Sequence, residues 1–128
     1  YVKMYQIISQ RATSAIQENS RLADTCEALK RGDYETVGKN IYATHHGMSK
    51  LYEVSTEELD FLNDVAKECG VTGSRIMGGG FGGCTINLVK DAYYDRFIET
   101  AISRFKTKFG KEPKVYPVTI SDGARKLN

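Results

Sequence analysis

Five of the twelve glycines in this chain lie within six consecutive residues, 78–83. Glycine loses more backbone entropy on folding than any other residue, so such a cluster is retained mainly where the backbone needs positive φ or must approach another group closely. Successive backbone N–H groups in such a turn can bind an anion, most often a phosphate. The residue types alone leave two hypotheses open: a phosphate-binding loop, or a tight hairpin packed beneath a neighbouring segment.

This glycine segment must be compared with two nucleotide-binding loops. Gly78, Gly80 and Gly83 have the spacing G-x-G-x-x-G of a dinucleotide-binding loop. That loop leads directly into a helix, whereas residues 84–89 alternate in a β-favouring composition that predicts a strand. No Lys-Ser or Lys-Thr pair follows the glycines, as a Walker A loop requires. We therefore assign neither loop to this segment.

Arg75 lies just before the glycine segment, on an expected strand. A guanidinium at this position could contact a phosphate. An arginine early on a strand is more often paired with a carboxylate, and we favour pairing with Glu53 or Glu58.

Two adjacent histidines, His45 and His46, fall within an expected helix. Adjacent helical residues point in different directions, and without a third ligand at helical spacing they make a weak metal site. We expect His45 to be buried and hydrogen-bonded, orienting residues 52–53. Ser55 is interpreted as a helix cap, and Asp60 as a carboxylate on a helix surface or bridging to a loop.

The elements that position these residues follow from the spacing of apolar residues. Asp33 can cap the second helix, Ser55 and Glu58 form a capping box for the third, and Gly110 stops the fourth. The expected order is a helix over residues 4–29, a helix from residue 33 whose end we leave open, a helix over 55–69, strands over 74–77 and 84–89, a helix over 91–109, and a strand over 114–120. This order predicts an α+β layered domain.

Length and charge narrow the class of protein. A chain of 128 residues fits one domain, and a net charge of +2 is too small to indicate a nucleic-acid or membrane surface. No stretch approaches the roughly 20 apolar residues of a membrane span. Three widely spaced cysteines predict reduced, buried side chains in a cytoplasmic protein. The helical pattern starts within a few residues of Tyr1, with no initiator methionine, so we expect the sequence to come from a longer chain.

Four segments resemble conserved stretches of galactokinases. Residues 73–84, GSRIMGGGFGGC, are similar to the motif G-[AS]-R-M-T-G-G-G-F-G-G-C. Thr44-His45 followed by residues 52–60, YEVSTEELD, resembles the family's S-H-x-S-L-x-x-x-Y-E-V-S-x-x-E-L-D. Residues 29–34 and 120–125 resemble its L-x-x-G-D-(Y/F) turn and its terminal D-G-A. Because these motifs keep the family's order and spacing nearly end to end, the chain is identified as a galactokinase C-terminal domain of the GHMP kinase superfamily.

This resemblance implies a fold and an activity. It implies one two-layer domain over residues 1–128, with helices packed on a small, mostly antiparallel sheet of the ferredoxin-like type. The implied reaction transfers the γ-phosphoryl group of ATP to the 1-hydroxyl of galactose, assisted by Mg²⁺. ATP, Mg²⁺ and galactose would be held mainly by an N-terminal domain absent from this sequence. The fragment alone is then expected to be inactive and able to self-associate through apolar surface.

The resemblance assigns no catalytic residue and no metal ligand to this chain. It implies that Gly78, Gly79, Gly80 and Gly82 form a wall near substrate and phosphate, with Phe81 as an apolar anchor. We expect Gly79→Val to cost at least about 1–3 kcal/mol in folding or catalysis, because the loop should be crowded.

The sequence also departs from the galactokinase pattern. Met77 stands where the family usually has threonine, Gly47 and Met48 replace Ser-Leu, and Leu51 replaces an aspartate. Loss of the hydroxyl at Met77 keeps two alternatives open: a galactokinase-like sensor that binds ligands without turnover, and a GHMP kinase that acts on another sugar.

Overall fold

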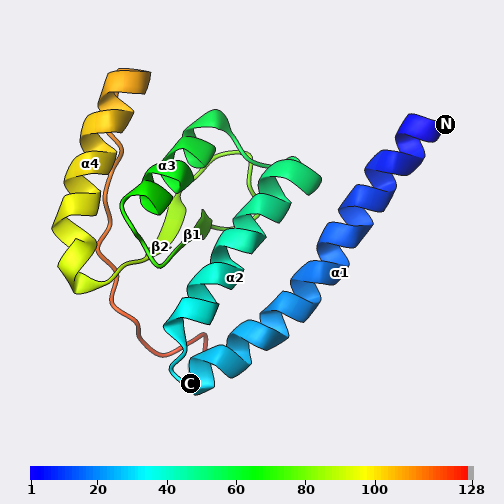
Figure 1. The fold of residues 1–128 in the computed structure, drawn as a ribbon, viewed down its shortest axis with the longest axis horizontal. Coiled ribbons are helices and arrows are strands. Elements are labelled where there is room, and N and C mark those ends of the chain that lie inside the picture. The colour runs from blue at the N-terminus through cyan, green and yellow to red at the C-terminus, as the bar shows by residue number, and fades with distance from the viewer. Residues whose placement is uncertain (127–128) are drawn as a thin grey trace.

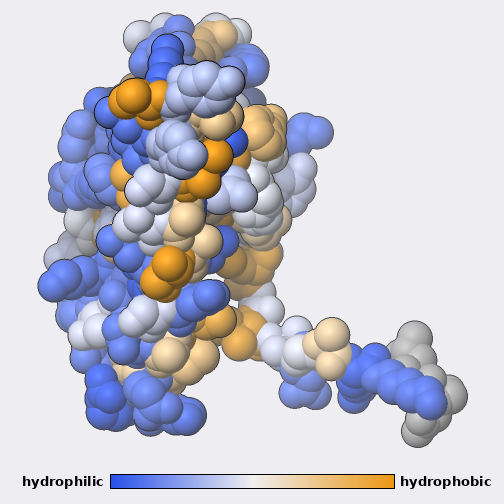
Figure 2. All heavy atoms as spheres, turned by 90° about the vertical axis from the view of Figure 1, so that its right-hand side faces the viewer, coloured by the Kyte–Doolittle hydropathy of each residue, from blue (hydrophilic) through white to orange (hydrophobic). Residues whose placement is uncertain are grey.

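The first element is a single long helix. A computed structural model describes residues 1–126, and within it α1 spans Val2–Lys30. Figure 1 shows the N-terminal turns of α1 projecting beyond the rest of the molecule. The expected helix is confirmed, but much of its apolar stripe is uncovered: Ile8 is 56% and Ile16 70% exposed. Figure 2, which faces α1, shows apolar side chains scattered among hydrophilic ones.

The second helix, α2 (Tyr34–His46), packs between α1 and the sheet. Asp33 caps it as expected, since its Oδ1 accepts the Thr36 N–H at 3.1 Å. Its sequence contains Gly38, which weakens a helix but here allows close packing: a Cβ on Gly38 would lie 1.9 Å from the Thr72 carbonyl oxygen. The helix runs directly into the π-helical turn η1 (Gly47–Leu51), which settles the end that the sequence left open.

The third helix, α3, spans Glu57–Glu68. Its cap is Thr56, whose Oγ1 accepts the Leu59 N–H at 3.4 Å, so the prediction that Ser55 is the cap was wrong by one residue. The reason is that the Ser55 hydroxyl has a stronger acceptor: it donates to Asp60 Oδ1 at 2.6 Å.

Two antiparallel strands flank the glycine segment, as expected. β1 (Gly73–Ile76) pairs with β2 (Thr85–Leu88) in the register Gly73↔Leu88 to Ile76↔Thr85. Both α2 and α3 pack on β1. The helices and the small antiparallel sheet confirm the α+β fold class (Figure 1).

The strand predicted over residues 114–120 is wrong. Up to residue 126 the chain after α4 has no strand, and these residues are mostly exposed. In Figure 2 the C-terminal stretch, which ends at the grey residues, extends away from the body. A strand needs hydrogen bonds to a neighbouring strand, and β1 and β2 pair only with each other in the described sheet.

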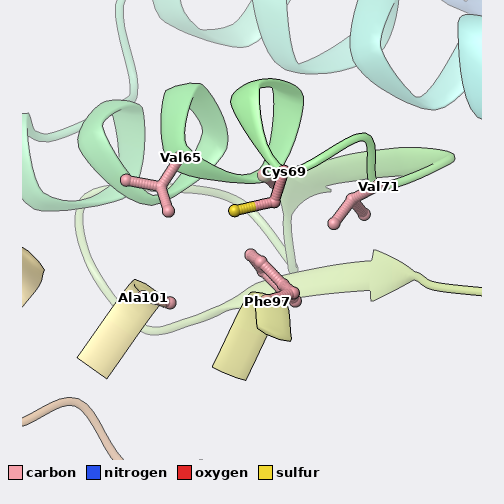
Figure 3. Close-up of a cluster of buried hydrophobic side chains, with 6 residues drawn as sticks. Val65, Cys69, Val71, Phe97 and Ala101 are labelled. Carbon is pink, nitrogen blue, oxygen red and sulfur yellow. The ribbon is translucent and has the colours of Figure 1, made fainter. Parts of the chain in front are cut away.

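The main core lies between α3 and the last helix, α4 (Asp91–Phe109), which ends at Gly110 as expected. Figure 3 shows side chains of α3 facing those of α4, with Val65 and Cys69 on one side and Phe97 and Ala101 on the other. The cluster contains Val65, Ala66, Cys69, Val71, Phe97 and Ala101. All three cysteines are free, but the prediction that all are buried holds only for Cys69, since Cys26 on α1 is exposed and Cys84 is half-buried. No helix in residues 1–126 is long and apolar enough to cross a membrane.

Candidate functional site

The glycine segment forms the turn of the β1–β2 hairpin. The Met77 N–H donates to the Cys84 carbonyl at 3.0 Å and extends the strand pairing by one step. Beyond it the backbone enters the left-handed region repeatedly, with φ of 79° at Gly78, 93° at Gly80, 125° at Gly82 and 91° at Gly83. Side chains are disfavoured at these φ values, which explains why glycine occupies them.

Most of this turn is sterically open. A Cβ built on Gly78, Gly79, Gly82 or Gly83 would meet no atom within 4 Å. The expectation that a side chain at Gly79 would be crowded is therefore wrong for the described chain, and Gly79 also lacks a positive φ. Crowding is confined to Gly80, where a Cβ would lie 2.3 Å from the Val54 carbonyl oxygen.

Phe81 fixes the turn through its backbone. Its N–H donates to the same Val54 carbonyl at 2.6 Å, and its φ is 60°, which is unusual for a residue with a side chain. The Phe81 ring is 80% exposed. Within the described residues the anchor is therefore the Phe81 amide, where the sequence suggested the ring.

The support behind the turn is the segment that joins η1 to α3. Val54 is buried, and its N–H donates to the Met48 carbonyl at 2.9 Å. The preceding residue, Glu53, has φ of 60°. Sequence reasoning did not single out Val54, because its role rests on a backbone carbonyl that every residue possesses.

The Asp60 carboxylate holds this support in place. Its Oδ1 lies 3.0 Å from His45 Nε2 and accepts the Ser55 hydroxyl at 2.6 Å. Its Oδ2 accepts the Ser49 hydroxyl at 2.8 Å and lies 3.8 Å from Lys50 Nζ. Asp60 thus bridges to loops, which was one of its two expected roles. We call Asp60, His45, Ser49 and Ser55 the Asp60 network.

The charges within this network follow from burial and hydrogen bonding. Burial alone would raise the pKa of Asp60, but hydrogen bonds from Ser55, Ser49 and His45 outweigh it and hold that pKa below its usual value. Burial lowers the pKa of His45 below its usual value, against the opposing hydrogen bond and charge of Asp60. At neutral pH the charged Asp60 carboxylate therefore accepts a hydrogen bond from the Nε2–H group of a neutral His45. His45 is buried and hydrogen-bonded, as predicted.

Arg75 does not make the carboxylate pair expected for it. Its Nε donates to the Ile76 carbonyl at 2.9 Å, while Glu58 lies 3.6 Å from Lys111. The sequence did not reveal that α4 ends beside α3, where lysines near the end of α4 lie close to the carboxylates of α3. Arg75 instead lines a cleft of about 240 Å³ together with Ser14, Ala15, Glu18, Thr44, Met48 and Tyr52.

The donor set of the turn suits an anion better than a metal. Its backbone has open space where side chains would begin at Gly78, Gly79, Gly82 and Gly83, and successive backbone amides in such a turn can bind an anion. Within residues 1–126, no cluster of three or more His, Cys, Asp or Glu side chains is arranged to hold a metal ion. The arrangement can thus bring N–H groups close to a phosphate without side-chain bulk.

Comparisons with known proteins agree with this geometry. The family model described as "GHMP kinases C terminal" matches residues 26–107, which include η1, the Asp60 network and the whole glycine segment. Galactokinase of Clostridium acetobutylicum is 43% identical over 120 residues, covering 93% of this chain and 31% of the relative. Galactokinase of Thermotoga petrophila is 37% identical over 121 residues, covering 94% and 35%. The chain thus spans about a third of the length of the curated relatives it matches.

Solved structures show the same relationship. The crystal structure of Lactococcus lactis galactokinase complexed with galactose superposes with a TM-score of 0.78 at 31% identity, over 84% of this chain and 28% of that one. L. major mevalonate kinase, solved with R-mevalonate, shares the fold with a TM-score of 0.63 at 19% identity, over 78% of this chain and 34% of that one. The resemblance to galactokinases seen in the motifs is confirmed, and the chain belongs to the family of GHMP kinase C-terminal domains.

Proposed function

We propose that this chain forms one wall of a galactokinase active site. The full-length gene product would transfer the γ-phosphoryl group of ATP to the 1-hydroxyl of galactose. The observation that carries the proposal is the glycine turn, whose backbone is open at residues 78, 79, 82 and 83 and pinned at Gly80, in a chain similar to galactokinases. Residues 78–83 are then the substrate- and phosphate-proximal loop.

The chemistry fits the groups present. Phosphoryl transfer depends mainly on positioning and on stabilising charge, with little covalent work for the protein. Backbone N–H groups held rigidly in the turn can stabilise phosphate charge, because they need no reorganisation during the reaction. Mg²⁺ bound with ATP would neutralise further phosphate charge. The chain spans about a third of the length of its galactokinase relatives, and we assign ATP, Mg²⁺ and the sugar mainly to the remaining part of such a protein.

A phosphorylation assay tests this function. The full-length gene product is incubated with ATP, Mg²⁺ and galactose, and galactose 1-phosphate is measured; the present chain alone serves as a control that is expected to be inactive. Comparing kcat/KM for galactose, N-acetylgalactosamine and a heptose tests the sugar assignment. A clear preference for another sugar would replace galactokinase by a different GHMP kinase.

Met77 supports a second candidate, a sensor without turnover. Its side chain is exposed beside the glycine turn, where the galactokinase motif usually supplies a hydroxyl. A sensor would bind both galactose and ATP in calorimetry and release no sugar phosphate. Met77→Thr in the full-length gene product then shows whether that hydroxyl restores turnover.

The proposal extends to the cellular location of the full-length gene product and to self-association of the chain. We propose that the full-length gene product acts in the cytoplasm, where ATP is available, on small-molecule ligands and without a nucleic-acid or membrane partner. The chain by itself would self-associate through the uncovered apolar residues of α1, such as Ile8 and Ile16. Sedimentation equilibrium of the chain alone would show this self-association.

A further inference from the structure

The Asp60 network joins three segments that meet behind the glycine turn. His45 comes from α2, Ser49 from the π-helical turn η1, and Ser55 from the loop before α3. All three reach the same carboxylate at 2.6–3.0 Å. Hydrogen bonds to an ionised acceptor are stronger than those between neutral groups, so this carboxylate fixes the relative positions of the three segments.

Capping of α3 does not explain this arrangement. Thr56 already caps the helix, and Glu57 and Glu58 supply negative charge to its first turn. Asp60 points its carboxylate at groups from other segments, and its side chain stays 33% exposed. Its contacts therefore serve the placement of η1 and of the loop before α3.

One covalent step separates the network from the glycine turn. Ser55 is bonded directly to Val54, and the Val54 carbonyl both accepts the Phe81 N–H at 2.6 Å and limits the approach of Gly80. Backbone on each side of this contact is unusual, since Glu53 and Phe81 both have φ of 60°. Such conformations persist only where the surrounding structure determines them.

We infer that Asp60 is a positioning residue for the glycine turn: through Ser55, Ser49 and His45 it sets the Val54 carbonyl, which in turn sets Gly80 and Phe81. The inference rests on the proposed function for its effect on catalysis. Asp60 touches no reacting group and acts only through the Val54 carbonyl.

The test compares Asp60→Asn with Asp64→Asn in the full-length gene product. Asparagine keeps the size of the side chain but removes the charge and one acceptor oxygen, so at least one donor of the network loses its partner. Asp64 lies one turn further along α3, where its exposed carboxylate pairs with Lys67 at 3.7 Å and accepts none of the hydrogen bonds of the Asp60 network, so the same chemical change there is a matched control.

The first readout is hydrogen–deuterium exchange. We expect the Phe81 amide to exchange at least about tenfold faster in Asp60→Asn, because its hydrogen bond to the Val54 carbonyl opens more often. Exchange in the buried strand β1 should match the wild type, which separates a displaced turn from general loss of stability. The Asp64→Asn protein should match the wild type in both segments.

The second readout is kinetic. With sugar and ATP, Asp60→Asn should lower kcat about ten- to a hundredfold with a smaller change in KM. A displaced glycine turn should weaken stabilisation of the transition state more than binding of the substrates. Ser55→Ala, which removes one hydrogen bond and leaves the others, should give an intermediate effect on exchange and on kcat. This milder variant decides the question if Asp60→Asn does not fold.

The two readouts keep the inference and the proposed function distinct. Unchanged exchange of the Phe81 amide in a folded Asp60→Asn or Ser55→Ala protein overturns the inference, as does equal acceleration in β1. Faster exchange confined to the turn supports it. If the turn is released but the wild type phosphorylates no sugar, the positioning role holds and the proposed function fails.

Discussion

Glycines perform opposite tasks in two parts of this molecule. At the contact of α2 with β1, a Cβ on Gly38 would lie 1.9 Å from the Thr72 carbonyl oxygen, and one on Gly73 would lie 2.8 Å from Gly38 Cα. In the turn at residues 78–83, four of the five glycines have open space where a Cβ would be. The first pair brings two backbones together, whereas the turn leaves its backbone uncovered.

The role of a glycine in this molecule therefore depends on which atoms lie opposite it. The entropy cost of ordering glycine is similar in both regions, and at Gly38 close packing of helix on strand offsets it. In the turn, Gly80 is the one glycine where a Cβ would meet other atoms of the described chain, and these belong to Val54. This fits a surface kept clear for a ligand.

The largest effect is expected at the packed contact. Gly38→Val should lower the free energy of unfolding by about 3 kcal/mol or more, because a branched side chain would overlap the Thr72 carbonyl and force α2 away from β1. Denaturant unfolding of the full-length gene product measures the change. Wild-type stability in this variant would show that α2 does not lie as close to β1 as described.

Gly80→Ala should be next in size. Its φ of 93° and the Val54 carbonyl 2.3 Å from the new Cβ predict a loss of about 1–3 kcal/mol in stability, together with reduced kcat. Gly79→Ala is the matched control and should stay within about 0.5 kcal/mol of wild type in unfolding. Equal losses in both variants would remove the distinction between the pinned and the open part of the turn.

Acid should lower the stability of the folded chain through two members of the Asp60 network, His45 and Asp60. The pKa of His45 is lower in the folded chain than its usual 6.5, so the folded state binds fewer protons and loses stability as pH falls from about 6.5 through the folded pKa. The lowered pKa of Asp60 adds a second loss, from about pH 4 downward through its folded value.

Thermal unfolding between pH 7.5 and 5 checks the His45 contribution. The wild-type Tm should fall with acid, and His45→Gln should flatten this dependence. His46→Gln changes an exposed neighbour and should keep the wild-type slope. A slope unaffected by His45→Gln would contradict the assignment of a buried, neutral imidazole.

The smallest effect on folding is expected from Phe81→Ala. The ring is 80% exposed, so its removal should change the free energy of unfolding by less than about 0.5 kcal/mol. The Phe81 amide and its hydrogen bond to Val54 remain. A loss above 1 kcal/mol in the full-length gene product, measured by denaturant unfolding, would show that the ring is an apolar anchor packed against residues outside this chain.

Local signals predicted the helices and the hairpin well. The Asp33 cap, the Gly110 stop and the alternating residues after the glycines involve interactions between residues that are close in sequence. They can therefore be recognised without knowledge of the tertiary structure. Predictions that depended on a contact with another segment of the chain were less accurate. The strand over 114–120 lacks a neighbouring strand, Arg75 bonds the Ile76 carbonyl, and the hydroxyl of Ser55 turns to Asp60.

By itself the sequence determined that the chain is an α+β domain, that its hairpin carries an exceptional glycine turn, and that its motifs resemble galactokinases. Only the tertiary structure decided which glycines are packed and which are open, and that Val54 and the Asp60 network stand behind the turn. The physical reason is that caps and alternation depend on neighbours in sequence, whereas crowding and buried hydrogen bonds depend on atoms brought together from distant segments.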